Sequence, residues 1–309
     1  MPNRTTTPRR RIPVLNVLFG ATLGVYIFFI GGIIVADLLY VAGTRRGQSE
    51  FKSLLLSRIP TDAELETMSV KERAYFAELK RRRKEVAYAF WLSIWTSVVA
   101  AAIALVISVP AGYVLSRGRF PGVRLVDALV DVPIVLPPLV FGISLLVLFQ
   151  RTFIGPGLES LGLRFVHDPK GIVLVQVLIA AAYGTRMLKG TFDSVDPRLS
   201  AVALTLGSSR ARAFFTVTLS IARSGVVAAL VMIWARALAL YGPVIAFAGT
   251  TSMHTEVMPT RMYLEMNIGQ LEAALLLALA MIAMAVVVLL VLKLAVGRTS
   301  DRTLQMLRL

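Results

Sequence analysis

The chain has 309 residues, of which 56% are hydrophobic, and it carries a formal net charge of +15. A soluble domain is nearer half apolar, and here the apolar residues form blocks separated by short charged stretches, as expected for a chain in lipid. The basic residues lie between these blocks, which favours topological signals and lipid headgroup contacts over nucleic-acid binding. The sequence contains no cysteine, which excludes disulfides, thiolate metal sites and cysteine nucleophiles.

Six apolar blocks are long enough to cross a bilayer, for which a helix needs roughly 20 residues. They lie at about 14–42, 87–115, 125–149, 171–188, 226–248 and 271–296. The apolar core of the first block is far longer than the roughly 7–15 residues of a signal peptide, so we expect a retained helix. The blocks predict an all-α membrane protein with about six transmembrane helices.

The third block contains Pro133, Pro137 and Pro138, which predict a kink or break. Proline removes a backbone donor and clashes with the preceding turn. In lipid, a break is tolerated only where protein or a water-lined cavity satisfies the freed backbone groups. The region 133–138 is therefore a candidate to lie near a pore, and a kink that serves only packing is the alternative.

Counts of lysine and arginine predict which loops face the cytoplasm. With the amino terminus inside and six crossings, the inside loops hold 17 basic residues, namely 4, 3, 6 and 4 in 1–13, 116–124, 186–223 and 293–309. The outside loops hold far fewer, namely 3 and 1 in 151–170 and 249–270. This asymmetry predicts a cytoplasmic amino terminus.

Segment 43–86 disagrees with this count, because it should lie outside and yet carries 11 basic and 7 acidic residues. The rule weakens for long loops, so we retain six crossings; a first block that does not cross fully is the alternative. The stretch 69–83 is expected to be helical. It either lies along the membrane surface, with Tyr75 and Phe76 dipping in, or forms a solvated helical extension.

These blocks predict the domain organisation. A cytoplasmic amino terminus, a first transmembrane helix and a charged, extracytoplasmic, partly helical insertion precede a core of five transmembrane helices and a cytoplasmic tail. The corresponding boundaries are 1–13, 14–42, 43–86, 87–297 and 298–309. Within the core, a cytoplasmic loop is predicted at 191–225.

The loop 191–225 has an unusual pattern for a connecting segment. Asp196 is suited to cap a helix with Pro197 in its first turn, and Gly207 and Ser208 break that helix. An amphipathic stretch follows, with basic residues on one side and apolar residues for the other: Arg210, Arg212, Phe214, Phe215, Val217 and Leu219. A helix–glycine–helix with exposed aromatic residues suits insertion into a groove on another protein, and packing on the membrane surface is the alternative.

This loop resembles the ATPase-docking loop of ABC importer permeases, whose pattern is Glu-Ala-Ala, three residues, Gly, nine residues, Ile, one residue and Leu-Pro. Ala201-Val202-Ala203, Gly207, Val217 and Leu219 stand at those positions. Ala201 replaces the glutamate and Ser220 the proline. The docking residues that the resemblance implies are Ala201, Ala203, Gly207, Ser208, Arg210, Phe214, Phe215 and Leu219.

The resemblance covers about residues 87–295. The segment 91–122, with its basic turn and Phe-Pro-Gly, looks like the second-helix region of these permeases. The Leu-Pro-Pro element within 125–149 resembles the molybdate, sulfate and tungstate permeases, as do Ala-Arg-Ala-Leu, Phe-Ala-Gly and Leu-Glu-Ala-Ala within 234–278. Ala239 and Leu240 replace the usual Gly-Glu of that subgroup. The resemblance implies the type I ABC importer permease architecture and a tetrahedral oxyanion substrate.

Arg236 is predicted inside the fifth block, where a charge is costly unless it faces the bundle interior or a cavity. It either adds positive potential to an anion pathway or pairs with helix carbonyls or a carboxylate, for which the candidates are Glu265, Glu272, Asp127 and Asp131. The candidate translocation pathway comprises Pro137, Pro138, Arg236, Tyr241 and Gly242. For Tyr241, Gln176 and Thr251, an interhelical hydrogen bond is the alternative to a pathway role.

The resemblance implies a multi-pass permease subunit of the inner (cytoplasmic) membrane, without enzymatic activity of its own. The sequence contains no GxxxxGK[ST] motif, so this chain would bind no cofactor, and ATP and Mg²⁺ would lie at a partner. The implied partners are an ABC ATPase dimer, an extracytoplasmic substrate-binding protein, a second permease copy and the bilayer. The binding protein would deliver molybdate, tungstate or sulfate to the loops 151–170 and 249–270, and ATPase closure would act near Gly207.

Other functions remain open. A membrane enzyme needs paired carboxylates, a histidine cluster or a Ser-Lys pair at membrane depth, and none is evident. The two histidines, His167 and His254, are far apart in predicted loops, so neither a catalytic nor a metal site is predicted. A non-transporting scaffold or regulatory subunit is another alternative, because the docking loop lacks the glutamate and the proline. A permease for another small solute is the third.

Overall fold

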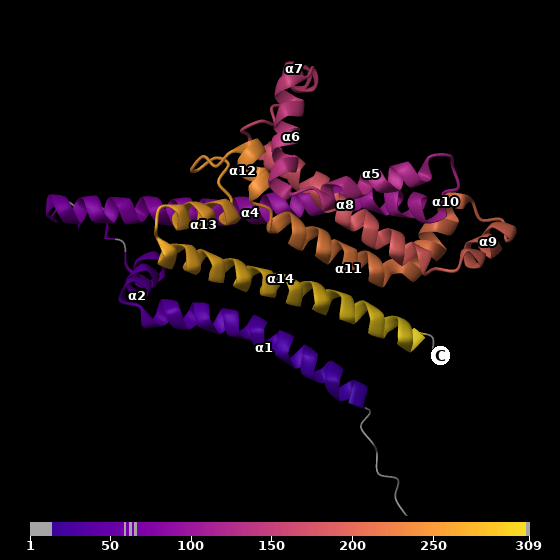
Figure 1. Ribbon diagram of the computed structural model, residues 1–309, viewed down its shortest axis with the longest axis horizontal. Helices are drawn as coiled ribbons and strands as arrows, with labels where there is room; N and C mark the ends of the chain where they lie inside the picture. Colours follow the sequence, from indigo (N-terminus) through magenta and orange to yellow (C-terminus); the bar gives the residue numbers. More distant parts are fainter. Residues whose placement is uncertain (1–13, 59, 62–63, 65–66, 307–309) are drawn as a thin grey trace, which may run out of the picture. The chain divides into compact units, whose positions relative to one another are not determined.

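Every element of regular structure in the described residues is a helix (Figure 1). The computed structural model describes residues 14–306 except 59, 62–63 and 65–66. These residues include five helices long and apolar enough to cross a membrane, and up to six spans if one sharply bent helix pair counts as a single span. The predicted all-α architecture with about six spans is confirmed. The predicted cytoplasmic segment 1–13 lies outside the described residues.

The chain divides into two units, Met1–Leu56 and Ser57–Leu309. In the first unit, α1 (Val14–Gly43) matches the predicted first transmembrane helix. A tight turn leads into α2 (Arg45–Phe51) and the π-helical turn η1 (Lys52–Leu56). This turn requires Gly47, because a Cβ there would overlap the backbone of Val41.

The second unit combines long helices with short connecting ones. In chain order they are α4 (Val70–Arg117), α5 (Val123–Val135), α6 (Pro138–Arg151), α7 (Ile154–Ser160), α8 (Pro169–Asp193), α9 (Pro197–Thr205), α10 (Arg210–Ala213), the π-helical turn η2 (Phe214–Thr218), α11 (Leu219–Leu238), α12 (Gly242–Ala248), α13 (Met258–Asn267) and α14 (Leu271–Met306). α4, α8, α11 and α14 lie side by side (Figure 1).

α4 begins at a capping box, in which Ser69 and Glu72 each accept a hydrogen bond from the other's backbone N–H. Its 48 residues extend about 72 Å, more than twice the roughly 30 Å of a hydrocarbon core. The predicted boundary at 86/87 falls inside this helix. The stretch from Val70 onward is thus a helical extension of a span. The continuous helix favours this extension over a separate helix lying along the membrane surface.

The break predicted in the third block is confirmed, since α5 and α6 are bent by 111°. Leu136 and Pro137 each precede a proline, which pushes a residue out of the helical region. Both have extended backbone, with ψ of 139° and 128°. Pro138 then occupies the first turn of α6, where a missing N–H removes no helical hydrogen bond.

α4 and α8 pack together and run in the same direction. Ser108 of α4 donates to the carbonyl of Ala181 at 3.0 Å, and Arg117 at the end of α4 donates to the carbonyls of Phe192 (2.9 Å) and Val195 at the end of α8. Two parallel helices need a connection that returns to the starting end. The segment containing α5 and α6 therefore carries the chain back across the bundle despite its bend.

α11 runs antiparallel to α8, so the bundle has two defined ends. Gly225 at the start of α11 lies against Thr191 near the end of α8, and Gln176 near the start of α8 donates to the carbonyl of Ala237 at 3.1 Å. We refer to the end that carries α9 as the α9 end and to the opposite one as the α13 end. The segments predicted to be cytoplasmic, 116–124 and 186–223, share the α9 end, while 249–270 lies at the α13 end. Which end faces the cytoplasm stays a prediction.

Small residues allow α4 and α8 to approach closely. Ala100 and Ala104 of α4 and Ala180 of α8 are fully buried. At Gly112 of α4, an added Cβ would lie 2.9 Å from the Cβ of Leu188. Lipid tails are as apolar as leucine, so close van der Waals packing, rather than the hydrophobic effect, holds such helices together.

We expect Gly112→Ala to destabilise the bundle by about 1–3 kcal/mol, because the new methyl group would force α4 away from α8. Gly190→Ala is the matched control on α8, since nothing lies within 4 Å of its Cβ position. That change should be neutral or stabilising by up to about 1 kcal/mol, the helix propensity gain. Thermal unfolding of the purified proteins in detergent measures both, and equal melting temperatures would contradict the packing argument.

Candidate functional site

The segment 191–225 folds as the predicted helix–glycine–helix at the α9 end. Asp196 caps α9 by accepting from the backbone N–H of Arg198 at 2.9 Å, and Pro197 is the first residue of the helix. Gly207 has φ of +88°, which only glycine adopts without strain. Ser209 caps the following helix through the backbone N–H of Arg212. The hairpin geometry therefore follows from its capping residues and Gly207.

The second half of the hairpin continues into the membrane. α10, η2 and α11 form one helix from Arg210 to Leu238, whereas the sequence predicted a fifth helix at 226–248. That prediction is wrong at both ends, because the helix starts earlier and stops before a break at 239–241. The break precedes Gly242-Pro243, and Pro243 fits only the first turn of a new helix, α12. The hairpin and the membrane break are thus two ends of one helix.

Several large apolar side chains of the hairpin are exposed, and we refer to four of them as the hairpin patch: Leu199, Val202, Leu206 and Phe215. Leu206 and Phe215 are 81% and 63% exposed. Leu199, Val202 and Leu206 are spaced so that they share one face of a helix. This spacing is visible in the sequence, but the residues predicted to dock did not include these three. Exposed apolar side chains gathered on a short, rigid hairpin mark an interaction surface.

The structure separates Phe214 from Phe215. The ring of Phe214 is half-buried, 4.7 Å from that of Tyr113 and 6.1 Å from that of Phe192, as measured between centroids. It packs the start of the helix onto α4 and α8. Of the two phenylalanines predicted to dock, the structure leaves Phe215 exposed and Phe214 half-buried, because the helix can present only one of two consecutive side chains outward. Docking itself stays a prediction.

The remaining residues of the predicted motif divide between surface and interior. Ala201, Gly207 and Arg210 are exposed, while Ala203, Ser208 and Leu219 are half-buried. Next to the missing glutamate, Ser200 hydrogen-bonds Thr218 at 2.9 Å and ties α9 to η2. At the position of the missing proline, Ser220 donates to the carbonyl of Phe215 at 3.3 Å. Ser200, next to the first departure, and Ser220, at the second, therefore make contacts within this chain.

Arg236 lies in the last turn of α11 against α8. Its guanidinium donates to the Tyr183 hydroxyl at 2.6 Å, and its Cζ lies 4.4 Å from the centroid of the Tyr183 ring. Its buried Nε has no hydrogen-bond partner within the described part of the chain. Arg236 is thus held by an aromatic ring and keeps one donor unused.

Three of the four carboxylates predicted as partners of Arg236 pair with other residues, and the fourth, Glu272, forms no ion pair with Arg236 in the described residues. Asp127 accepts from Lys189 at 2.9 Å, and Asp131 accepts from Arg186, so both tie α5 to α8. Glu265 pairs with Arg261 at 2.8 Å. Within the described residues, no carboxylate lies within 4 Å of Arg236. The position of these carboxylates near the predicted membrane boundary did not identify their partners. Asp127, Asp131 and Glu265 each lie closer to another basic residue than to Arg236.

The two broken segments at membrane depth meet each other. α6 packs on α12, and an added Cβ at Gly142 would lie 2.8 Å from the carbonyl oxygen of Pro243. Gly242 faces Leu139, which follows the exposed Pro137-Pro138 pair. The structure thus brings the predicted pathway residues of the third and fifth blocks together. Irregular backbone at this depth requires protein or a water-lined cavity around it.

The other polar candidates make the contacts expected of structural residues. The amide of Gln176 bridges to α11, as the alternative to a pathway role predicted, although its Oε1 has no partner in the described residues. The ring of Tyr241, exposed at the break, lies 5.6 Å from that of Tyr263 in α13. Thr251 bonds within its own loop, where its backbone N–H donates to Thr255 at 3.0 Å.

A buried charge cluster at the α13 end was missed by sequence reasoning. Arg261 of α13 lies 3.0 Å from Glu85 of α4, 3.2 Å from Glu256 and 2.8 Å from Glu265. All three carboxylates are at least nine-tenths buried. Arg82 also lies 3.5 Å from Glu265. Glu85 is 176 residues from Arg261, so no local pattern reveals the pair.

This cluster fixes the loop between α12 and α13 on α4. Burial raises the pKa of the Glu256 carboxyl above its usual range, and Arg261 opposes the rise. Nearby, the Met258 backbone N–H donates to Ser93 at 2.7 Å, and the Tyr88 hydroxyl donates to the carbonyl of His254 at 3.1 Å. The loop that the sequence predicts to be external is therefore rigidly attached to the extension of α4.

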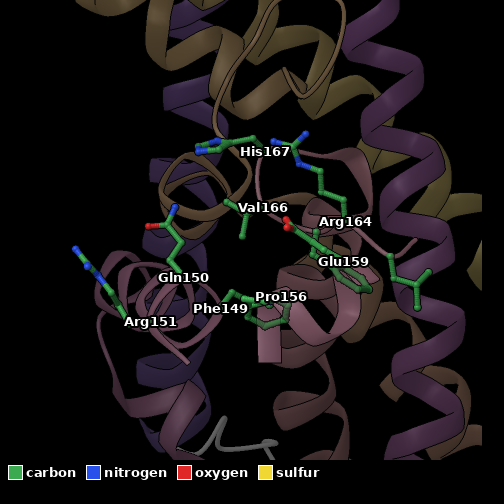
Figure 2. Close-up of a pocket in the computed structure, with 11 residues that line it drawn as sticks. Phe149, Gln150, Arg151, Pro156, Glu159, Arg164, Val166 and His167 are labelled. Carbon is green, nitrogen blue, oxygen red and sulfur yellow. The ribbon is translucent and has the colours of Figure 1, made fainter. Parts of the chain in front are cut away.

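A pocket of about 430 Å³ lies near the start of α8, between the end of α6, α7 and the loop 161–168 (Figure 2). Figure 2 shows Arg164 and Glu159 on one side, Gln150 on the other and His167 at the rim. The backbone N–H of His167, at a φ of 58°, donates to the carbonyl of Phe247 at 3.4 Å. The pocket thus carries both signs of charge next to α12.

A helical bundle with several candidate spans, two helix breaks and a hairpin at one end is the arrangement expected of a membrane permease. Residues 104–302 match the family described as binding-protein-dependent transport system inner membrane component. The chain therefore belongs to this family, whose members are multi-pass permease subunits of the inner membrane.

Curated relatives match about half to two thirds of this chain. The molybdate/tungstate transport system permease protein WtpB of Thermococcus kodakarensis is 40% identical over 156 residues, which are 50% of this chain and 58% of that protein. The molybdenum transport system permease protein ModB of Escherichia coli is 34% identical over 179 residues, 56% of this chain and 78% of that protein. The matched segment thus spans less than two thirds of the archaeal relative.

Solved structures support the fold. A bacterial ABC transporter for alginate, in complex with an alginate-bound periplasmic protein, aligns with a TM-score of 0.62 at 15% identity, covering 90% of this chain and 92% of that chain. A second alginate importer structure gives a TM-score of 0.59 at 14% identity, covering 91% and 98%. The predicted ABC importer permease architecture is confirmed, and at this identity the likeness concerns the fold alone.

We expect Arg261→Met to destabilise the protein by about 3–5 kcal/mol, because it leaves three buried carboxylates without their shared cation. A raised carboxyl pKa means that the folded state binds the proton more tightly, so this part of the stability is present at low pH and lost as pH rises. The melting temperature of the variant should therefore recover between about pH 8 and about pH 5.

Arg58→Met is the matched control, since Arg58 is 80% exposed and pairs with Glu64, which lies outside the cluster. Its loss should cost no more than about 1 kcal/mol. Circular dichroism melts at both pH values measure the effect. An Arg261→Met protein as stable as the Arg58→Met protein at the higher pH would show that the cluster is not a clamp.

Proposed function

We propose that this chain is the permease subunit of an ATP-driven importer of a tetrahedral oxyanion, molybdate or tungstate. The observation that carries the proposal is the likeness to relatives described as molybdate/tungstate and molybdenum permeases, at 40% and 34% identity. The family match at residues 104–302 includes α6 and α12, which would form the pathway. Sulfate, which has the same shape and charge, is the nearest competing substrate.

The pathway would pass the meeting point of the two breaks, between α6 and α12. Arg236 supports this assignment because it is a cation at membrane depth without a carboxylate partner in the described residues. Its unused Nε donor and its positive charge suit a dianion in transit. Tyr183 would hold the guanidinium in place between passages of substrate.

The hairpin patch would dock into an ABC ATPase, which alone would bind ATP and Mg²⁺. Large apolar anchors in a groove carry most of the energy of such interfaces, and Leu206 and Phe215 are the exposed anchors here. Because Arg210–Leu238 is one helix, a displacement of the hairpin would reach the break at 239–241 as a rigid movement. ATPase closure would thereby open and close the pathway.

The other partners follow from the same arrangement. A second copy of the chain would complete the permease as a homodimer, and an extracytoplasmic binding protein would approach the α13 end. This orientation puts the amino terminus in the cytoplasm, as the lysine and arginine count predicts. The rigid attachment of the loop 249–257 to α4 would give the binding protein a fixed surface.

A non-transporting scaffold is the second candidate function. The observation that favours it is the replacement of the motif glutamate by Ala201 and of the motif proline by Ser220. Such a protein would bind the ATPase without stimulating it. The two functions differ in whether a substrate-loaded binding protein raises ATP hydrolysis by the complex.

We expect Leu206→Asp to abolish copurification of the ATPase, because a carboxylate cannot be buried unpaired in an apolar groove. Val70→Asp is the matched control, since Val70 is 80% exposed and Leu206 81%, and Val70 lies at the opposite end of the bundle. Affinity purification of the tagged chain with its ATPase measures both. Equal recovery of ATPase with both variants would refute docking through the hairpin patch.

The transport proposal predicts ATP-dependent uptake of molybdate or tungstate by vesicles that contain the chain, its ATPase and its binding protein. Arg236→Met should lower uptake roughly tenfold or more, the loss expected for one charge-assisted contact. Arg236→Lys retains the positive charge but not the planar contact with Tyr183, so it separates a role in the pathway from one in packing.

If Lys restores most of the uptake, the charge acts on the anion. If Lys fails as Met does and both variants melt early, Arg236 is structural and the pathway assignment is wrong. ATPase that copurifies but is not stimulated by the loaded binding protein supports the scaffold. Stimulation by sulfate alone would replace the proposed substrate while keeping the permease.

A further inference from the structure

An apolar groove of about 570 Å³ runs along α4 and α8. Thr96 and Val177, at 1% and 6% exposure, form its floor. Trp95 and Ile103 of α4 and Leu178 of α8 form its exposed walls. Both helices are long and apolar enough to cross the membrane, so this groove opens toward lipid.

One end of the groove lies at the start of α8, where Phe165, Pro169 and Lys170 line it. The Lys170 side chain is exposed and makes no ion pair within 4 Å in the part of the chain that the structure describes. The neighbouring Asp168 accepts from the Lys170 backbone N–H at 2.9 Å and thereby caps the helix. The groove therefore ends at a lysine that forms no ion pair with the described residues.

We propose that this groove binds an anionic phospholipid, with one acyl chain along Val177 and its phosphate at Lys170. An apolar channel that ends at a cation is complementary to an amphiphile with an anionic head. Trp95 adds an aromatic ring of the kind enriched at headgroup depth. The headgroup of a zwitterionic lipid also carries a cationic group, which Lys170 would repel. Such a lipid would therefore bind less tightly. The proposal is independent of the transported substrate.

The position of Trp95 allows a direct test, because the chain has only three tryptophans. The full-length chain with Trp91→Phe and Trp234→Phe retains Trp95 as its single fluorophore. It is reconstituted in phosphatidylcholine vesicles that contain increasing fractions of brominated phosphatidylglycerol or brominated phosphatidylcholine. Bromine on the acyl chain quenches a tryptophan that it contacts, so the quenching curve reports occupancy of the groove.

We expect brominated phosphatidylglycerol to quench Trp95 at about fivefold lower mole fraction than brominated phosphatidylcholine, the preference that one lysine provides near a headgroup. Lys170→Gln should remove this preference and Lys170→Arg should retain it. The matched control keeps Trp91 instead of Trp95. Trp91 is 68% exposed, lies one helical turn away and does not line the groove, so it should show no preference.

Three results on lipid preference would overturn the proposal: equal quenching of Trp95 by both lipids, the same preference at Trp91, and a preference that survives Lys170→Gln. A fourth contrary result is the absence of quenching at Trp95 by either lipid. A protein segment, such as a second copy of the chain, would then cover the groove. Helix content from circular dichroism confirms that each variant is folded before it is compared.

Discussion

The parallel packing of α4 against α8 is the constraint on which the second unit depends. Gly112 and the buried alanines bring the two helices close, and Arg117 joins their ends by donating to the carbonyls of Phe192 and Val195. Parallel neighbours require the intervening chain to return, so α5 and α6 must span the bundle in spite of three prolines. The break between them is then held against α12, where a second break lies.

The same geometry connects the hairpin to the membrane interior. Phe214 anchors the start of the long helix on Tyr113 and Phe192, while Phe215 and Leu206 remain exposed. One aromatic residue thus serves the core and its neighbour serves the surface. Because the helix runs unbroken to Leu238, the hairpin, Arg236 and the break at 239–241 form one mechanical element. A partner that moves the hairpin has no flexible segment in which the motion is lost.

Three basic residues of the second unit differ in how their charge is met. At the α13 end, Arg261 satisfies three buried carboxylates, an arrangement that stabilises only while it is complete. In the membrane, Arg236 rests on an aromatic ring. At the start of α8, Lys170 stands beside an apolar groove. Arg261 forms ion pairs with carboxylates of the protein. Arg236 and Lys170 form no ion pair in the described residues, so their charges suit anionic ligands.

The sequence alone determined the helical class, the approximate spans, the break at Pro137-Pro138 and the hairpin at Gly207. These features depend on local chemistry: block length against bilayer thickness, the missing proline N–H, and the positive φ of glycine. It also predicted the family through spacing. It misjudged the ends of the fifth helix, because apolar residues continue through the break at 239–241.

Only the tertiary structure decided which side chains meet. Arg236 rests on Tyr183 and not on a carboxylate, Phe214 turns inward, and Glu85 pairs with Arg261 across 176 residues of sequence. Each outcome depends on the register between helices, which packing sets and which no local pattern encodes. The groove that ends at Lys170 is of the same kind, since its two walls belong to helices whose alignment follows from the contact of Gly112 with Leu188.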